Sequence, residues 1–190
     1  MFRRVLHTCL LALAALLIAG LTSTAYAQTS GYTPTSSNGG TAYLAPAGKA
    51  KIVGGIAIPP ADAPPQVVGM VNAANAISSK PYRYGGGHAK FEDTAYDCSG
   101  SVSYVLHGGG LLTSPLFSSL FMKWGAAGIG RWVTVYTNPG HAFMVLAGLR
   151  FDTGYRDRGA HITGIRPGSG PRWGKPRPTR GYVARHPAGF

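Results

Sequence analysis

Apolar residues between positions 65 and 79 recur every three or four residues, and this spacing predicts an amphipathic helix that ends before a proline. A second helix is predicted over 97–106, because Asp97 is a favourable N-cap residue and the glycines at 108–110 stop a helix. The segment between the two helices is turn-rich, and its glycines at 85–87 permit close backbone approach. The folded part of the chain therefore begins with helices.

The pattern changes to that of β-strands after a short predicted helix at 115–124. The strands are predicted at 131–137, 141–147, 149–153 and 181–185. The run at 141–147 is apolar on both faces, which is typical of a covered central strand. Because helices come first and strands follow, the order of elements predicts the α+β class with a small antiparallel sheet.

The first 27 residues have a basic start, an apolar run at 10–21 and small residues at positions 25 and 27. These three parts predict a secretory signal peptide that is cleaved before Gln28. The alternative is an uncleaved membrane anchor, but no stop-transfer segment follows. We therefore expect a secreted, periplasmic or cell-wall protein without stable membrane insertion after cleavage.

Residues 28–65 are rich in Ser, Thr, Gly, Ala and Pro, which predicts a flexible linker. The short apolar stretch at 52–58 within it is expected to pack at most as an isolated strand. The remaining residues, 66–190, are enough for one folded domain with a basic C-terminal tail, which we expect to be a monomer.

The chain is strongly basic, with a formal net charge of +12 that becomes +10 when the two leader arginines are subtracted. Residues 166–190 hold six of the basic side chains and no acidic one: Arg166, Arg172, Lys175, Arg177, Arg180 and Arg185. In an exported protein such a surface favours peptidoglycan and other anionic wall polymers over nucleic acid. We expect the tail to bind wall polymers without taking part in chemistry; the alternative is a solvated surface that only keeps the protein soluble.

The mature chain keeps one cysteine, Cys98, because Cys9 leaves with the leader. Cys98 begins the second predicted helix, where the helix dipole and free backbone N–H groups favour the thiolate, which is the nucleophilic form. The alternative is a buried, inert thiol. His141 opens a strand after a turn and is the predicted general base. His88, His161 and His186 are expected in solvent, and His107 is expected to offset a helix dipole.

Three motifs resemble the NlpC-type family of papain-like cysteine endopeptidases, which are bacterial peptidoglycan hydrolases: P-Y-R-Y-G-G at 81–86, D-C-S-G at 97–100 and G-H at 140–141. The resemblance covers residues 66–155. It implies a papain-like fold in which Cys98 attacks a peptide carbonyl and His141 is the base. It also implies that Tyr82 and the backbone N–H of Cys98 stabilise the oxyanion, and that a polar residue on the next strand orients the histidine. The substrates would be stem-peptide bonds of peptidoglycan.

The third polar residue of the family pattern falls at or next to Asp152. A hairpin that turns at 148–149 would pair Val145 with Asp152, which places Asp152 on the His141 face but about 13 Å along the strand. Contact would then need a bulge or a different register, and the alternative for Asp152 is a surface turn residue. The segment between Gly86 and Cys98 is also longer than the family pattern.

No histidine or cysteine pair has metal-ligand spacing, so neither a metal nor a cofactor is expected. The sequence therefore predicts a secreted cysteine peptidase that acts on peptidoglycan stem peptides. Two alternatives stay open. One is a thiol amidase or acyl transferase of the same fold, and the other is an inactive cell-wall-binding module.

Overall fold

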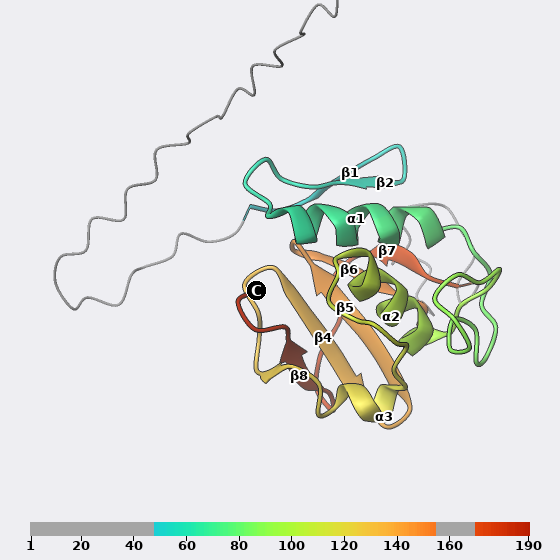
Figure 1. Cartoon of the computed structure of the whole chain (residues 1–190). Coiled ribbons are helices and arrows are strands. Elements are labelled where there is room, and N and C mark those ends of the chain that lie inside the picture. The colour runs from blue at the N-terminus through green and yellow to red at the C-terminus, as the bar shows by residue number, and fades with distance from the viewer. Residues whose placement is uncertain (1–47, 155–169) are drawn as a thin grey trace, which may run out of the picture. The chain divides into compact units, whose positions relative to one another are not determined.

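The computed structural model describes residues 48–154 and 170–190 (Figure 1). The predicted signal peptide, most of the predicted linker, His161 and Arg166 lie outside these residues. Within the described part of the chain, no helix has both the length and the apolar character that crossing a membrane requires.

Helices come before the main sheet in the chain, as the order of patterns predicts. The elements are β1 (Lys51–Val53), β2 (Ile56–Ile58), α1 (Pro65–Ile77), α2 (Cys98–Gly108), α3 (Ser118–Phe121), β3 (Ala126–Ala127), β4 (Val133–Asn138), β5 (His141–Leu146), β6 (Leu149–Asp152), β7 (Arg172–Gly174) and β8 (Val183–His186). Both predicted long helices and the four predicted strands are present, with bounds that shift by a few residues. The short predicted helix at 115–124 is a single turn.

Six strands form one antiparallel sheet in the order β3-β8-β4-β5-β6-β7. Figure 1 shows α1 and α2 crossing one face of this sheet, with α2 against β5. The core between helices and sheet is fully buried and includes Val67, Met70, Val71, Val102, Leu106, Met144 and Phe151. The α+β class with helices packed on an antiparallel sheet is confirmed. Burial of this apolar face positions the start of α2 over the start of β5.

The apolar stretch at 52–58 is a β-hairpin, so the prediction of an isolated strand was wrong. Gly54 and Gly55 form its turn with φ values of 57° and 82°, which suits a two-residue hairpin turn. Asn75 on α1 holds the hairpin, because its side chain accepts from the Ala57 N–H at 2.9 Å and donates to the Ala57 carbonyl at 2.8 Å. Residues 51–58 therefore pack on the domain that follows them.

The turn between β5 and β6 falls one residue earlier than predicted. Ala147 and Gly148 are its central residues, with φ values of 45° and 78°, and Val145 pairs with Arg150. This register moves Asp152 two residues, or about 6.6 Å, closer to His141 than a turn at 148–149 would place it. The predicted separation of about 13 Å was therefore wrong, and no bulge is needed for contact.

The C-terminal segment contributes a strand that sequence patterns did not predict. β7 pairs with β6, and its residues Arg172 and Trp173 are fully buried. The Trp173 ring packs on Phe151 with centroids 4.9 Å apart, and its indole N–H donates to Asn75 Oδ1 at 2.8 Å. Arg172 was predicted as part of an exposed basic tail, and its burial in the sheet corrects that prediction.

Candidate active site

Cys98 is the first residue of α2, where the helix N-terminus meets the sheet. The N-cap residue Asp97 accepts from the backbone N–H of Gly100 at 2.7 Å, which fixes the first turn. Cys98 Sγ lies 3.7 Å from Ser118 Oγ. Burial by itself raises the pKa of the Cys98 thiol, but hydrogen bonds from the His141 ring and the Ala142 backbone N–H, together with the charge of His141, outweigh it. The pKa therefore lies below its ordinary value of 9.0.

His141 is the first residue of β5 and lies between Cys98 and Asp152. Its Nε2 is 2.8 Å from Asp152 Oδ1, and the ring also forms a hydrogen bond with Cys98. Burial by itself lowers the pKa of His141. Hydrogen bonds to Asp152 and Cys98, together with the negative charges of both, outweigh burial and raise the pKa from 6.5 to about 9. The arrangement favours a thiolate paired with an imidazolium.

Asp152, at the end of β6, has a fully buried side chain whose two oxygens face different partners. Oδ1 forms a hydrogen bond with His141 Nε2 and accepts another from the backbone N–H of Gly154, each at 2.8 Å. Oδ2 accepts from Arg177 Nη1 at 3.1 Å and lies 3.8 Å from Arg150 Nε. Burial by itself raises the Asp152 pKa, but the His141 hydrogen bond and charge and the Gly154 N–H outweigh it and hold the pKa below its ordinary value. These contacts therefore favour the anionic form of Asp152 and hold its Oδ1 against the His141 ring.

Tyr82 lines the same cavity as Cys98, which has a volume of about 400 Å³. Tyr82 is 43% exposed, and its backbone is bridged to Tyr96 just before the Asp97 N-cap. The pKa of Tyr82 is raised, first by burial and then by the negative charges of Cys98 and Asp97. Tyr82 therefore stays protonated and can donate a hydrogen bond into the cavity.

His88 lies under the N-terminus of α2, so the prediction that it is in solvent was wrong. Its side chain is 9% exposed, and Nε2 lies 3.0 and 3.1 Å from the two oxygens of Asp97. The ring stacks on Phe117 with centroids 4.4 Å apart. His88 therefore braces the capping carboxylate that begins the Cys98 helix. Its glycine-rich sequence surroundings carry no signal of this contact.

The long segment between Gly86 and Cys98 is a loop that internal hydrogen bonds hold in place. Asp93 accepts from the backbone N–H of Gly87 at 3.0 Å and from the Arg83 guanidinium. The Tyr96 hydroxyl donates to the Phe91 carbonyl at 2.9 Å and accepts from the Asp93 N–H. These bonds hold the loop against the segment that carries Tyr82.

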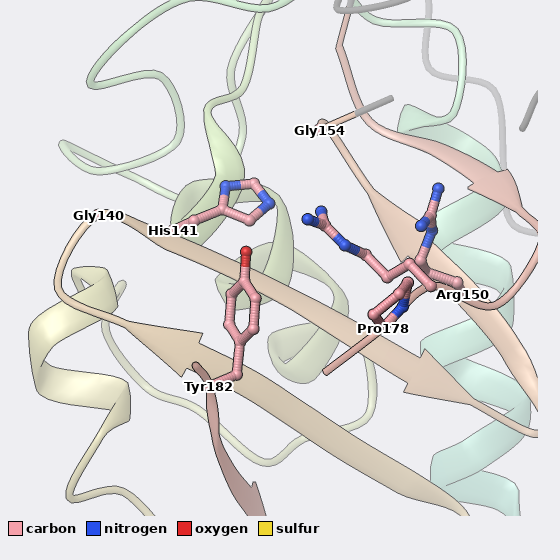
Figure 2. Close-up of a pocket in the computed structure, with 7 residues that line it drawn as sticks. Gly140, His141, Arg150, Gly154, Pro178 and Tyr182 are labelled. Carbon is pink, nitrogen blue, oxygen red and sulfur yellow. The ribbon is translucent and has the colours of Figure 1, made fainter. Parts of the chain in front are cut away.

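Arg177 and Tyr182 belong to the C-terminal segment, which is predicted to take no part in the reaction. In the structure both side chains lie beside His141 and Asp152. The Arg177 guanidinium lies over the rings of Phe143 and Tyr182, at 5.2 and 5.5 Å from their centroids. The Tyr182 ring meets the His141 ring edge-on at 6.3 Å, and Figure 2 shows its hydroxyl directed toward His141. Arg177 contacts Asp152 and is therefore not part of an exposed tail. Its proline- and arginine-rich surroundings gave no signal of this.

The structure thus brings Cys98, His141 and Asp152 into one line of contacts, with Tyr82 on the Cys98 cavity. Among residues 48–154 and 170–190, no group of three or more His, Cys, Asp or Glu side chains could hold a metal ion. The chemistry that these residues can perform is nucleophilic attack by a thiolate with a histidine as acid and base.

No family model matches the chain, and the comparison with curated proteins found no match. Solved structures with partial similarity include the peptidoglycan hydrolase RipB of Mycobacterium tuberculosis, at 20% identity over 68% of each chain with a TM-score of 0.45. A cysteine-mutated form of the resuscitation promoting factor interacting protein RipA is 20% identical over 75% of this chain and 70% of its own, also with a TM-score of 0.45.

Proposed function

We propose that the protein is an exported, papain-like cysteine peptidase that hydrolyses peptide bonds in the stem peptides of peptidoglycan. The observation that carries this proposal is that His141 contacts both Asp152 and Cys98, and that Cys98 lines a cavity together with Tyr82. The substrate class rests on the NlpC-type motifs around these residues. The basic charge of the chain agrees with an anionic polymer as substrate.

The proposed reaction has two halves. The Cys98 thiolate attacks the peptide carbonyl carbon, and the oxyanion accepts hydrogen bonds from the Cys98 backbone N–H and the Tyr82 hydroxyl. The His141 imidazolium then gives its proton to the leaving amine, which leaves a thioester on Cys98. In the second half His141 takes a proton from water, whose oxygen attacks the thioester and releases the acid. Asp152 keeps the His141 ring in place throughout.

Digestion of purified peptidoglycan with mass spectrometry of the fragments tests this proposal. We expect new free amino and carboxyl termini within stem peptides. Release of intact stem peptides from the sugar would instead identify a thiol amidase, and transfer of an acyl group to an added amine would identify a transferase. The absence of any new fragment would favour the inactive wall-binding module.

Asp152→Asn is expected to move the alkaline limb of the pH profile of kcat/KM to lower pH. In the parent enzyme this limb reports loss of the His141 proton, near pH 9. Removal of the Asp152 charge withdraws the interaction that raises this pKa, so it falls toward 6.5. Rates on a soluble muropeptide from pH 5 to 10 measure this shift of the alkaline limb.

Asp62→Asn is the matched control, because it changes an exposed carboxylate near the N-terminal hairpin. An alkaline limb that does not move would show that Asp152 does not act on the catalytic histidine.

Lys175 and Arg180 are the exposed basic residues of the C-terminal segment that remain candidates for wall binding. Their double change to Gln is expected to weaken binding to intact walls by about two- to tenfold at low salt, and less at high salt, because exposed charges are screened. Turnover of a soluble muropeptide should change little. Co-sedimentation with purified walls measures the effect. Lys90→Gln with Lys123→Gln removes the same charge elsewhere on the surface. Equal losses in both double variants would show that the C-terminal segment has no special role.

A further inference from the structure

A second cavity, of about 490 Å³, opens beside His141 and shares the turn residue Gly140 with the Cys98 cavity. Its polar wall is formed by His141, Arg150, Arg177 and Tyr182. Figure 2 shows the side chains of His141, Arg150 and Tyr182 around this cavity. The two cavities therefore adjoin at the turn that precedes His141.

The two cavities differ in charge. The described residues that line the His141 cavity include two arginines and no carboxylate, whereas those that line the Cys98 cavity include Asp97 and no Lys or Arg. Asp152 is close to the arginines, but its side chain is fully buried behind the cavity wall. One buried carboxylate thus faces Arg150, Arg177 and His141. Positive charge exceeds negative charge on this side of the site.

Arg177 is held in an orientation that suits it to bind an anion. Nη1 donates to Asp152 Oδ2, and the guanidinium carbon lies over the rings of Phe143 and Tyr182. A guanidinium has five N–H donors, so several remain beyond the bond to Asp152, and 27% of the side chain is exposed. A preorganised arginine fork matches the two oxygens of a carboxylate, and little side-chain entropy is lost on binding.

We propose that the His141 cavity binds a carboxylate of the substrate through Arg177, on the side of the scissile bond opposite the Cys98 cavity. The inference rests on the proposed function and deepens it by naming the group that the enzyme selects. The Cys98 cavity, with Tyr82, Tyr84 and Phe117 in its wall, takes the less charged part of the peptide. The charge difference between the cavities thereby sets the direction in which the peptide lies.

Two soluble muropeptides test the proposal, one with free carboxylates and one with every carboxylate amidated. Amidation is expected to raise KM for the parent enzyme by roughly 10- to 100-fold, because a charge-assisted bond to Arg177 is lost. Arg177→Gln is expected to lower kcat on both substrates, since Asp152 loses a partner, and to bring the ratio of the two KM values close to one. Arg131→Gln, which changes an exposed arginine outside the described lining of both cavities, should keep the parent ratio.

Equal KM values for the two substrates in the parent enzyme, or an unchanged ratio in Arg177→Gln, would overturn the inference. If Arg177→Gln does not fold, Arg177→Lys replaces it; loss of the planar fork should lower the ratio at least about threefold, and an unchanged ratio again overturns it.

Calorimetric binding of both muropeptides to Cys98→Ala separates this inference from the proposed function. If the parent enzyme cleaves neither substrate, the proposed function fails, and the cavity is judged by binding alone. The inference is supported if Cys98→Ala binds the muropeptide with free carboxylates more tightly than the amidated one, and if the added change Arg177→Gln removes this preference. Equal affinity for the two muropeptides contradicts it.

Discussion

Replacement of Cys98 by alanine is expected to lower hydrolysis of peptidoglycan by at least about 10³-fold while the protein stays folded. Cys98 supplies the nucleophile, and no other thiol is present after residue 9. Alanine is small and is tolerated at a helix start, and Asp97 keeps its capping bonds to Gly100 and His88. The loss should therefore be one of chemistry and not of structure.

Release of new amino groups from purified walls measures this effect, with circular dichroism and thermal unfolding to confirm the fold. Ser119→Ala is the matched control, since it removes a small polar atom from an exposed residue in the wall of the same cavity. This control should keep most of the parent rate. Wall hydrolysis at the parent rate by folded Cys98→Ala would exclude a cysteine mechanism.

The second large effect is expected for His141→Ala, which should lower kcat by roughly 10²- to 10⁴-fold, the usual contribution of a general acid and base. The imidazolium also stabilises the thiolate, so the pKa of Cys98 should rise and its alkylation by iodoacetamide at neutral pH should slow. The alkylation rate needs no substrate, and it therefore tests the ion pair separately from hydrolysis.

The double variant of Cys98→Ala with His141→Ala should have about the same residual rate as Cys98→Ala alone, because the two side chains act as a unit. His107→Ala is the control, since His107 lies in the last turn of the same helix and bonds the Leu112 carbonyl. Independent multiplication of the two effects, or an unchanged alkylation rate in His141→Ala, would assign His141 a structural role only.

Local patterns were sufficient for the elements that carry Cys98 and His141. The 3.6-residue spacing gave α1, and the Asp97 cap with the glycines after it gave α2. The turn at Asn138 with the apolar run behind it gave β4 and β5. In each case the signal lies within about ten residues of the element that it predicts, so no long-range contact had to be known.

The contact between His141 and Asp152 could not be predicted in the same way, because it depends on one turn. Ala147 adopts a positive φ, which alanine rarely does, so a turn centred on 148 and 149 was the natural choice. When the turn moves by one residue, each residue of β5 pairs with a residue of β6 two positions away from the predicted partner. The predicted distance changed accordingly, although Asp152 itself was identified as the candidate.

The C-terminal segment was predicted to be an exposed basic tail because its composition carries no signal of its contacts with the sheet. Proline and arginine are typical of exposed segments, yet Arg172 and Trp173 are buried through pairing of β7 with β6, which is far from them in sequence. The hairpin at 51–58 was within reach of local reasoning. Two glycines between short apolar runs are a known signal for a two-residue turn.

Strands β7 and β8 are synthesised last, after the three strands that they flank in the sheet. These strands flank the meander β4–β5–β6 on opposite sides, and both come from residues 170–190. A nascent chain completes the meander first, so β4 and β6 have open edges that can pair with other chains. The same residues carry Arg177 and Tyr182 to His141. A chain stalled before them would hold the thiol and the imidazole in an aggregation-prone intermediate, without the groups that complete the site.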